Sequence, residues 1–161
     1  MPILNYPFGA DGPCIEVRIG VSQSRVSAYQ LAKLPVPEPV QARFLIDTGS
    51  DVTLVEAGLL GPLVLVSSGV MVVNTPSTGI TPVQLPRFDV SLTLLHPILP
   101  YTVNTVSIAE CPAFGSDIKG LLGRDVLSHC LVIYNGHLGT FSIASDRPST
   151  RCECHDLSAV R

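Results

Sequence analysis

Charged residues are scarce in this 161-residue sequence, where only 14% of positions are Asp, Glu, Lys or Arg. A typical soluble domain has about 25%. Hydrophobic residues make up 46%, so a folded monomer would leave apolar surface in water, and such surface usually marks an interface. A tightly packed β-protein accounts for the composition equally well. The composition therefore indicates self-association, an apolar cleft or a dense core, without choosing among them.

Several partner classes are excluded by features that the sequence lacks. The ten Lys and Arg residues are scattered and the net charge is −3, so we expect no nucleic-acid partner, which would need a basic stripe. The most apolar stretch, residues 59–73, is broken by Gly, Pro and Ser and is shorter than the roughly 20 residues of a membrane helix. The first residues lack a basic segment followed by an apolar core. We therefore predict no signal peptide, no membrane contact and a cytoplasmic location.

Motifs for nucleophilic, phosphate and metal chemistry are also missing. No Ser or Cys has a His partner at motif spacing, and no glycine-rich loop has phosphate-binding spacing. The five cysteines are an odd number, and without a secretory signal we expect reduced thiols. Cys152, Cys154 and His155 could supply three metal ligands, but no second ligand cluster accompanies them. We predict no metal and no cofactor, and keep a metal-binding tail as a weaker alternative.

The distribution of proline and glycine predicts an all-β domain. Fourteen Pro and thirteen Gly separate short runs rich in Val, Ile, Leu and Thr. The proline-rich segment 34–39 is predicted to be an exposed loop, and the only predicted helix is short, near residues 123–130. Strands are predicted at 14–21, 42–46, 52–55, 64–66, 70–74, 87–95 and 102–108, followed by a hairpin of 130–134 and 138–143 around Asn135-Gly136. We assign residues 1–144 to one domain and 145–161 to a polar, flexible tail.

The segment Phe44-Leu-Ile-Asp47-Thr48-Gly49-Ser50 is the most informative part of the sequence. An acid directly after an apolar strand is held beside the core, where desolvation disfavours its ionised form. Gly49 allows a tight turn, and Thr48 and Ser50 place hydroxyls within reach of a carboxylate or of the turn's backbone. Asp47 is therefore the candidate catalytic residue. An ordinary strand-to-turn junction would use the same residue types.

A second motif follows some 75 residues later, in Ile118-Lys-Gly-Leu121-Leu122-Gly123-Arg124-Asp125. In order and spacing the two motifs together resemble the retropepsin family of single-domain aspartic peptidases, over about residues 14–144. The resemblance implies a closed, barrel-like all-β fold with one short helix, in which the Asp-Thr-Gly strand lies beside the strand that ends in Leu121-Leu122-Gly123. It further implies an ion pair between Asp51 and Arg124 that fixes the active-site turn. Asp125 stands where related proteins carry Asn or Asp. Two independent, solvated charges remain the alternative for Asp51 and Arg124.

One Asp-Thr-Gly turn is half of what aspartic peptidase chemistry needs. Two carboxylates must share one proton, because like charges about 3 Å apart cannot both ionise. No other acid in the sequence is followed by Thr-Gly, so we predict a homodimer in which Asp47 of each chain completes the pair. The resemblance implies that Thr48 interlocks with the partner chain across the dimer.

The resemblance also implies a glycine-bearing flap over the substrate, which we place within residues 74–82 at Ser77, Thr78, Gly79 and Ile80. This segment has less glycine than viral flaps and carries Pro76 and Pro82, and a plain loop is the alternative. The C-terminal hairpin is similar to that of the cellular DNA-damage-inducible type. We predict that it builds part of the dimer interface, although its apolar residues could also pack into their own subunit.

The sequence therefore predicts an aspartic endopeptidase that hydrolyses extended peptide or protein substrates with water activated between two Asp47 carboxylates. The alternative function is a dimerisation or peptide-binding module of the same fold that does not turn substrate over.

Overall fold

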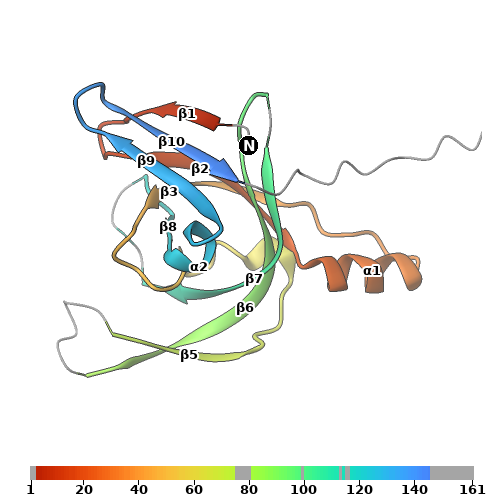
Figure 1. Ribbon diagram of the computed structural model, residues 1–161. Helices are drawn as coiled ribbons and strands as arrows, with labels where there is room; N and C mark the ends of the chain where they lie inside the picture. Colours follow the sequence, from red (N-terminus) through yellow and green to blue (C-terminus); the bar gives the residue numbers. More distant parts are fainter. Residues whose placement is uncertain (1–2, 75–80, 99, 113, 115–116, 146–161) are drawn as a thin grey trace, which may run out of the picture.

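Ten strands and two short helices form the described part of the chain (Figure 1). The computed structural model describes residues 3–74, 81–98, 100–112, 114 and 117–145. The strands are β1 (Ile3–Pro7), β2 (Cys14–Val21), β3 (Val40–Ile46), β4 (Leu54–Glu56), β5 (Gly69–Val73), β6 (Val83–Leu94), β7 (Tyr101–Cys111), β8 (Gly120–Leu122), β9 (Cys130–Asn135) and β10 (Thr140–Ser145). The helices are α1 (Gln23–Leu31) and α2 (Arg124–Leu127), with one 3-10 turn, η1 (Gly61–Leu63).

The larger sheet closes into a barrel of six strands, as predicted. Its order is β2-β3-β8-β4-β7-β6-β5, and the additional pairing of β2 with β6 closes the first six strands, so that β5 extends the sheet beyond the closed barrel. Alternate residues of β2, such as Ile15, Val17 and Ile19, are buried in the core. The apolar residues that alternate with polar ones along β2 therefore mark the inner face of the barrel.

A smaller sheet of order β1-β10-β9 packs on one side of the barrel (Figure 1). The predicted hairpin is present as β9 and β10, and β1 adds a third strand that was not predicted. The rings of Tyr6 on β1 and Phe141 on β10 stack 5.0 Å apart across the strands, and Phe141 belongs to the main core cluster, which joins this sheet to the barrel core. Val132 on β9 also faces the core cluster, so the opposite face of β9 is free to carry exposed side chains.

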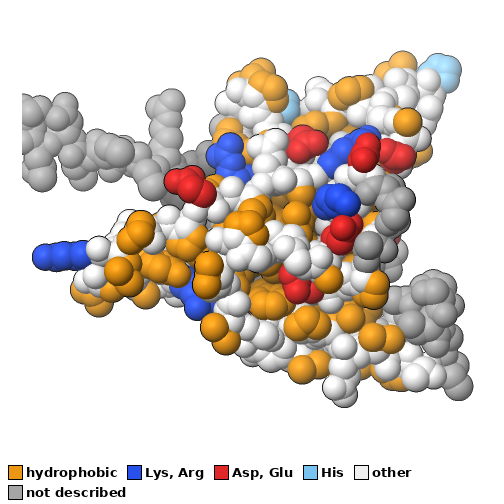
Figure 2. Space-filling view, turned by 180° about the vertical axis from the view of Figure 1, so that it is seen from behind, with side chains coloured by type: hydrophobic (Ala, Val, Ile, Leu, Met, Phe, Trp, Pro, Cys, Tyr) orange, Lys and Arg blue, Asp and Glu red, His pale blue; other side chains and the backbone are white. Residues whose placement is uncertain are grey.

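Two predictions about local structure were wrong. Helix α1 was not predicted, because its sequence has no apolar stripe and none of its residues is buried. It projects from the barrel, and Figure 2 shows hydrophobic side chains on the surface of this arm. Residues 64–66 do not form a strand: Gly61 and Pro62 begin the turn η1, and Val64 closes it with a left-handed φ of 49°.

Helix α2 is shorter than the predicted 123–130, since Gly123 is its N-cap and Ser128 its C-cap. The proline-rich segment 34–39, which follows α1, is a largely exposed loop, as predicted. Within the described part of the chain, no helix is long and apolar enough to span a membrane.

Candidate active site

Asp47 is the first residue after β3 and lies beside the end of β8. The two strands are parallel, with Leu45 opposite Leu121 and Ile46 opposite Leu122. The pairing continues one residue further, because the Asp47 N–H donates to the Leu122 carbonyl oxygen at 3.0 Å. The fold therefore brings the two sequence motifs side by side, although more than 70 residues separate them.

The turn after Asp47 holds its carboxylate through the backbone. The Gly49 N–H donates to Asp47 Oδ1 at 2.9 Å, and the Ser50 N–H donates to the Asp47 carbonyl oxygen at 3.2 Å. A Cβ at position 49 would stand 3.1 Å from Asp47 Oδ1. Asp47 itself is half-buried, and its Oδ2 accepts no hydrogen bond from the described residues. One carboxylate oxygen is thus fixed by the turn while the other is available to a substrate, a water or a second acid.

Arg124 connects helix α2 to this turn. Its Nη2 contacts Asp51 Oδ1 as an ion pair, and its Nη1 donates to the Thr48 carbonyl oxygen at 2.9 Å. The backbone adds a bond from Arg124 N–H to the Ser50 carbonyl oxygen at 2.9 Å. In the single chain the Arg124 and Asp51 side chains are 53% and 82% exposed. The ion pair therefore lies on the surface of the single chain. Arg124 holds the turn by bonding Thr48 and Asp51 at the same time, and burial of the charges contributes little.

Asp125 is joined to Thr53, a residue that the sequence analysis did not single out. Asp125 Oδ2 accepts from the Thr53 N–H at 2.8 Å and Oδ1 from the Thr53 hydroxyl at 2.7 Å. The same hydroxyl accepts the Gly123 N–H at 3.1 Å. Thr53 is completely buried, and the signal that could have identified it is a hydroxyl residue inside the apolar run Val52-Thr53-Leu54-Val55.

The Leu121-Leu122-Gly123 motif lies beside the strand that leads to Asp47. Leu122 and Gly123 are buried, and Leu121 is half-buried against a second apolar cluster. That cluster combines residues of several strands around the site: Leu54, Leu85 and Ala109, with Val52, Met71, Val73, Val83, Cys111, Phe114 and Leu121 packed against them. Leu121 links this cluster to the strand that leads to Asp47, because it pairs with Leu45 of β3.

The predicted flap residues Ser77, Thr78, Gly79 and Ile80 lie outside the described residues. The strands that flank them, β5 and β6, are antiparallel and pair up to Val73 opposite Val83. Val70 and Val72 of β5 are exposed. They alternate with Met71 and Val73, which pack against the apolar cluster, so their side chains point away from it.

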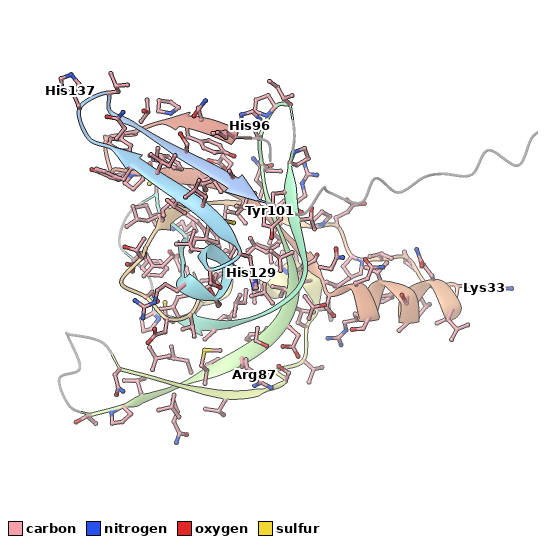
Figure 3. All side chains as sticks on the ribbon, viewed as in Figure 1. Lys33, Arg87, His96, Tyr101, His129 and His137 are labelled. Carbon is pink, nitrogen blue, oxygen red and sulfur yellow. The ribbon has the colours of Figure 1, made fainter. Side chains whose placement is uncertain are left out.

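Other candidate sites are separate from Asp47. His96, His129 and His137 lie at different points of the molecule (Figure 3), and no three His, Cys, Asp or Glu residues of the described chain are grouped to hold a metal. The proposed tail ligands Cys152, Cys154 and His155 lie beyond the described residues. Burial raises the pKa of the thiol of Cys130, which is a free cysteine.

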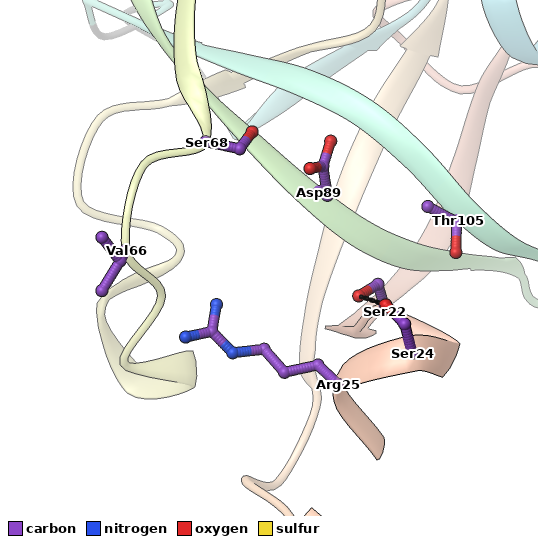
Figure 4. A pocket seen from close by; sticks show the side chains of 7 residues that line it. All are labelled: Ser22, Ser24, Arg25, Val66, Ser68, Asp89 and Thr105. Carbon is purple, nitrogen blue, oxygen red and sulfur yellow. Dashed lines mark hydrogen bonds between the residues drawn. The ribbon is translucent and has the colours of Figure 1, made fainter. Parts of the chain in front are cut away.

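Two surface cavities, of about 320 and 200 Å³, are lined by none of the predicted site residues. In the larger one Arg25 extends from α1 toward Val66, beside the hydrogen-bonded hydroxyls of Ser22 and Ser24 (Figure 4).

Comparison with known proteins identifies the fold. No protein-family model and no curated protein matches the sequence. Among solved structures, a retropepsin-like aspartic protease from Rickettsia conorii matches with a TM-score of 0.51 and 10% identity, over 88% of this chain and 89% of that one. An aspartic proteinase from Irpex lacteus matches with a TM-score of 0.55 and 12% identity, over 93% of this chain and 48% of that one. The chain has a retropepsin-like fold and spans about half the length of the Irpex lacteus protein.

Proposed function

We propose that this chain is an aspartic endopeptidase that acts as a homodimer, with Asp47 of each chain forming the catalytic pair. The observation that carries the proposal is the placement of Asp47 at the junction of β3 and β8, with one carboxylate oxygen bound by the Gly49 N–H and the other left free by the described residues. The fold that places it there is shared with proteins described as aspartic proteases.

The chemistry follows from a carboxylate pair that holds one proton. The ionised Asp47 removes a proton from a water molecule, whose oxygen attacks the carbonyl carbon of the scissile peptide. The protonated Asp47 of the other chain donates its proton to the carbonyl oxygen. The first Asp47 then gives the proton it took from water to the peptide nitrogen, the other Asp47 takes a proton from a hydroxyl of the tetrahedral diol as the C–N bond breaks, and the pair again holds one proton.

A second copy of the chain is required because one chain supplies one such acid. The exposed side chains of Leu131 and Ile133, 48% and 46% accessible, lie on β9, which is an edge strand. An exposed apolar edge is an unfavourable feature unless another chain covers it. Strand β9 begins three residues after α2, which is bonded to the Asp47 turn. We assign this edge, together with the exposed Thr48, to the dimer interface.

The substrate class follows from the lining of the site. We infer that the half-buried members of the second apolar cluster, such as Val52 and Leu121, line the substrate cleft and favour a peptide with apolar side chains on both sides of the scissile bond. The paired strands β5 and β6 lead to the segment 77–80 that we propose as the flap. An extended backbone would be held between this hairpin and the Asp47 turns.

The test is cleavage of a reduced and alkylated, unfolded protein at acidic pH by the wild type and by Asp47→Asn. Asp117→Asn, at an exposed acid, is the matched control. We expect cleavage by the wild type and the control, inhibition of both by a statine-containing peptide, and a loss of several orders of magnitude in Asp47→Asn. Equal cleavage by all three proteins would overturn the proposal. A dimer that binds extended peptides and never cuts them would instead support the peptide-binding module.

A further inference from the structure

The backbone N–H of Asp47 is bonded to the peptide group between Leu122 and Gly123. Its carbonyl oxygen accepts the Asp47 N–H at 3.0 Å. Its N–H donates to the hydroxyl oxygen of Thr53 at 3.1 Å. The two ends of one peptide plane therefore connect Asp47 to Thr53.

The direction of the Thr53 hydroxyl is fixed by its partners. A hydroxyl has one proton to donate, and its oxygen already accepts from Gly123. The proton therefore points to Asp125 Oδ1, 2.7 Å away. Asp125 is itself held by the N–H groups of Thr53 and Val126, at 2.8 and 2.9 Å. The carboxylate of Asp125 is thus the acceptor at the end of a continuous chain of hydrogen bonds that starts at the Asp47 N–H.

We propose that Thr53 is a positioning residue for the reaction: its hydroxyl orients the Leu122–Gly123 peptide and, through it, the backbone that carries the Asp47 carboxylate. The inference rests on the proposed function. Thr53 is completely buried, and hydrogen bonds in series polarise one another where water is excluded. Removing the hydroxyl leaves the Gly123 N–H without a partner and frees the peptide plane to turn.

A purely structural role for Thr53 makes a different prediction. If Thr53 only ties β4 to α2, its loss lowers stability and leaves the folded enzyme with normal turnover. If Thr53 positions Asp47, the folded enzyme loses turnover, because a displacement of about 1 Å in a catalytic group can cost on the order of 100-fold in rate. Substrate affinity depends on the apolar lining and is not altered in either case.

The test compares Thr53→Val, which removes the hydroxyl at nearly constant volume, with Thr53→Ser, which keeps it. The matched control is Thr102→Val, because Thr102 pairs with the Thr93 hydroxyl at 2.9 Å on an exposed part of β6 and β7. We expect Thr53→Val to lower kcat by roughly 10- to 100-fold with KM changed by less than about twofold. Thr53→Ser should recover most of the rate and Thr102→Val should match the wild type. A folded Thr53→Val dimer with wild-type kcat would overturn the inference.

A second measurement does not depend on activity. In amide NMR spectra of the full chain, Thr53→Val should move the Gly123 and Asp47 amide protons upfield, while Thr102→Val leaves both in place. Unchanged Gly123 and Asp47 signals would contradict the inference even if the enzyme were active. If Thr53→Val does not fold, Thr53→Cys replaces it, with a weaker bond and an intermediate shift and rate expected. A wild type without peptidase activity would sink the proposed function, whereas the NMR result would still decide the role of Thr53.

Discussion

Gly123 lies directly against the main chain of Val52: a Cβ added at Gly123 would come within 2.4 Å of the Val52 carbonyl carbon and oxygen. The φ of Gly123 is −87°, which any residue can adopt. Position 123 therefore requires glycine because of close approach and not because of its backbone conformation. This contact allows the end of β8 to pass behind the turn that carries Asp47.

Replacing Gly123 by alanine should destabilise the protein strongly, because the obstructing atoms belong to the backbone and cannot rotate aside. We expect the free energy of unfolding to fall by about 3 kcal/mol or more. Gly61→Ala is the control, since no atom lies within 4 Å of a Cβ built there. Urea denaturation of both variants measures the difference. Equal midpoints for the two would show that Gly123 is not confined as described.

Arg124→Lys should lower activity more than stability. A lysine cannot reproduce the two separate bonds of the guanidinium to Asp51 and to the Thr48 carbonyl oxygen. Because the side chains are exposed in the single chain, we expect a loss of less than about 1 kcal/mol in unfolding free energy. The less constrained turn should lower kcat/KM about tenfold. Arg43→Lys, at the Arg43–Asp11 pair of 3.0 Å, is the control for loss of a partly exposed ion pair. An equal loss of kcat/KM in that variant would remove the special role of Arg124.

A charge placed on the outer side of β9 should separate the subunits. Ile133→Asp puts a carboxylate on the edge strand that we assign to the interface. We expect sedimentation equilibrium to show a monomer, and activity to fall in parallel with the dimer fraction. Leu31→Asp is the control, because Leu31 is 88% exposed on the projecting helix α1. A dimer that persists in Ile133→Asp would exclude this edge as the contact.

Tyr6 should make the protein sensitive to alkali. Burial raises the pKa of Tyr6 from 10.0 to about 12. Since the pKa is higher in the folded state, the contribution of Tyr6 to stability is complete below pH 10 and is lost as the pH rises from there through about 12. Tyr6→Phe should therefore lose stability less steeply over this range, as measured by denaturant midpoints. Tyr134→Phe, at an exposed ring, should retain the wild-type slope, and identical slopes in all three proteins would contradict the assignment.

The sequence predicts the parts of the fold that local patterns determine. Alternation in β2 and the strand-turn-strand pattern around Asp47 predict individual strands, whereas the barrel and the pairing of the Asp47 strand with β8 were predicted only through the resemblance to the retropepsin family. Helix α1 carries no such signal, since it buries none of its residues. Strand β1 is five residues long and gains its structure from β10, more than 130 residues away along the chain.

The contacts of Thr53 could not be predicted from its one sequence signal, a hydroxyl residue inside an apolar run. A threonine within an apolar run is common in strands, and only the fold shows that its hydroxyl meets both Gly123 and Asp125. The prediction for Val64 failed for a related reason. Its β-branched side chain favours a strand, but the turn begun by Gly61 and Pro62 places it in a left-handed conformation.

The central claim is that hydrolysis needs one acid from each of two chains. Wild-type and Asp47→Asn chains are mixed in equal amounts, unfolded and refolded together. Random pairing then gives three kinds of dimer, and about one quarter of all dimers carry two Asp47 residues. We predict that the mixture has about one quarter of the activity of the same total amount of wild-type chain refolded alone. Retention of about one half, which is the result for chains that act independently, would contradict the account.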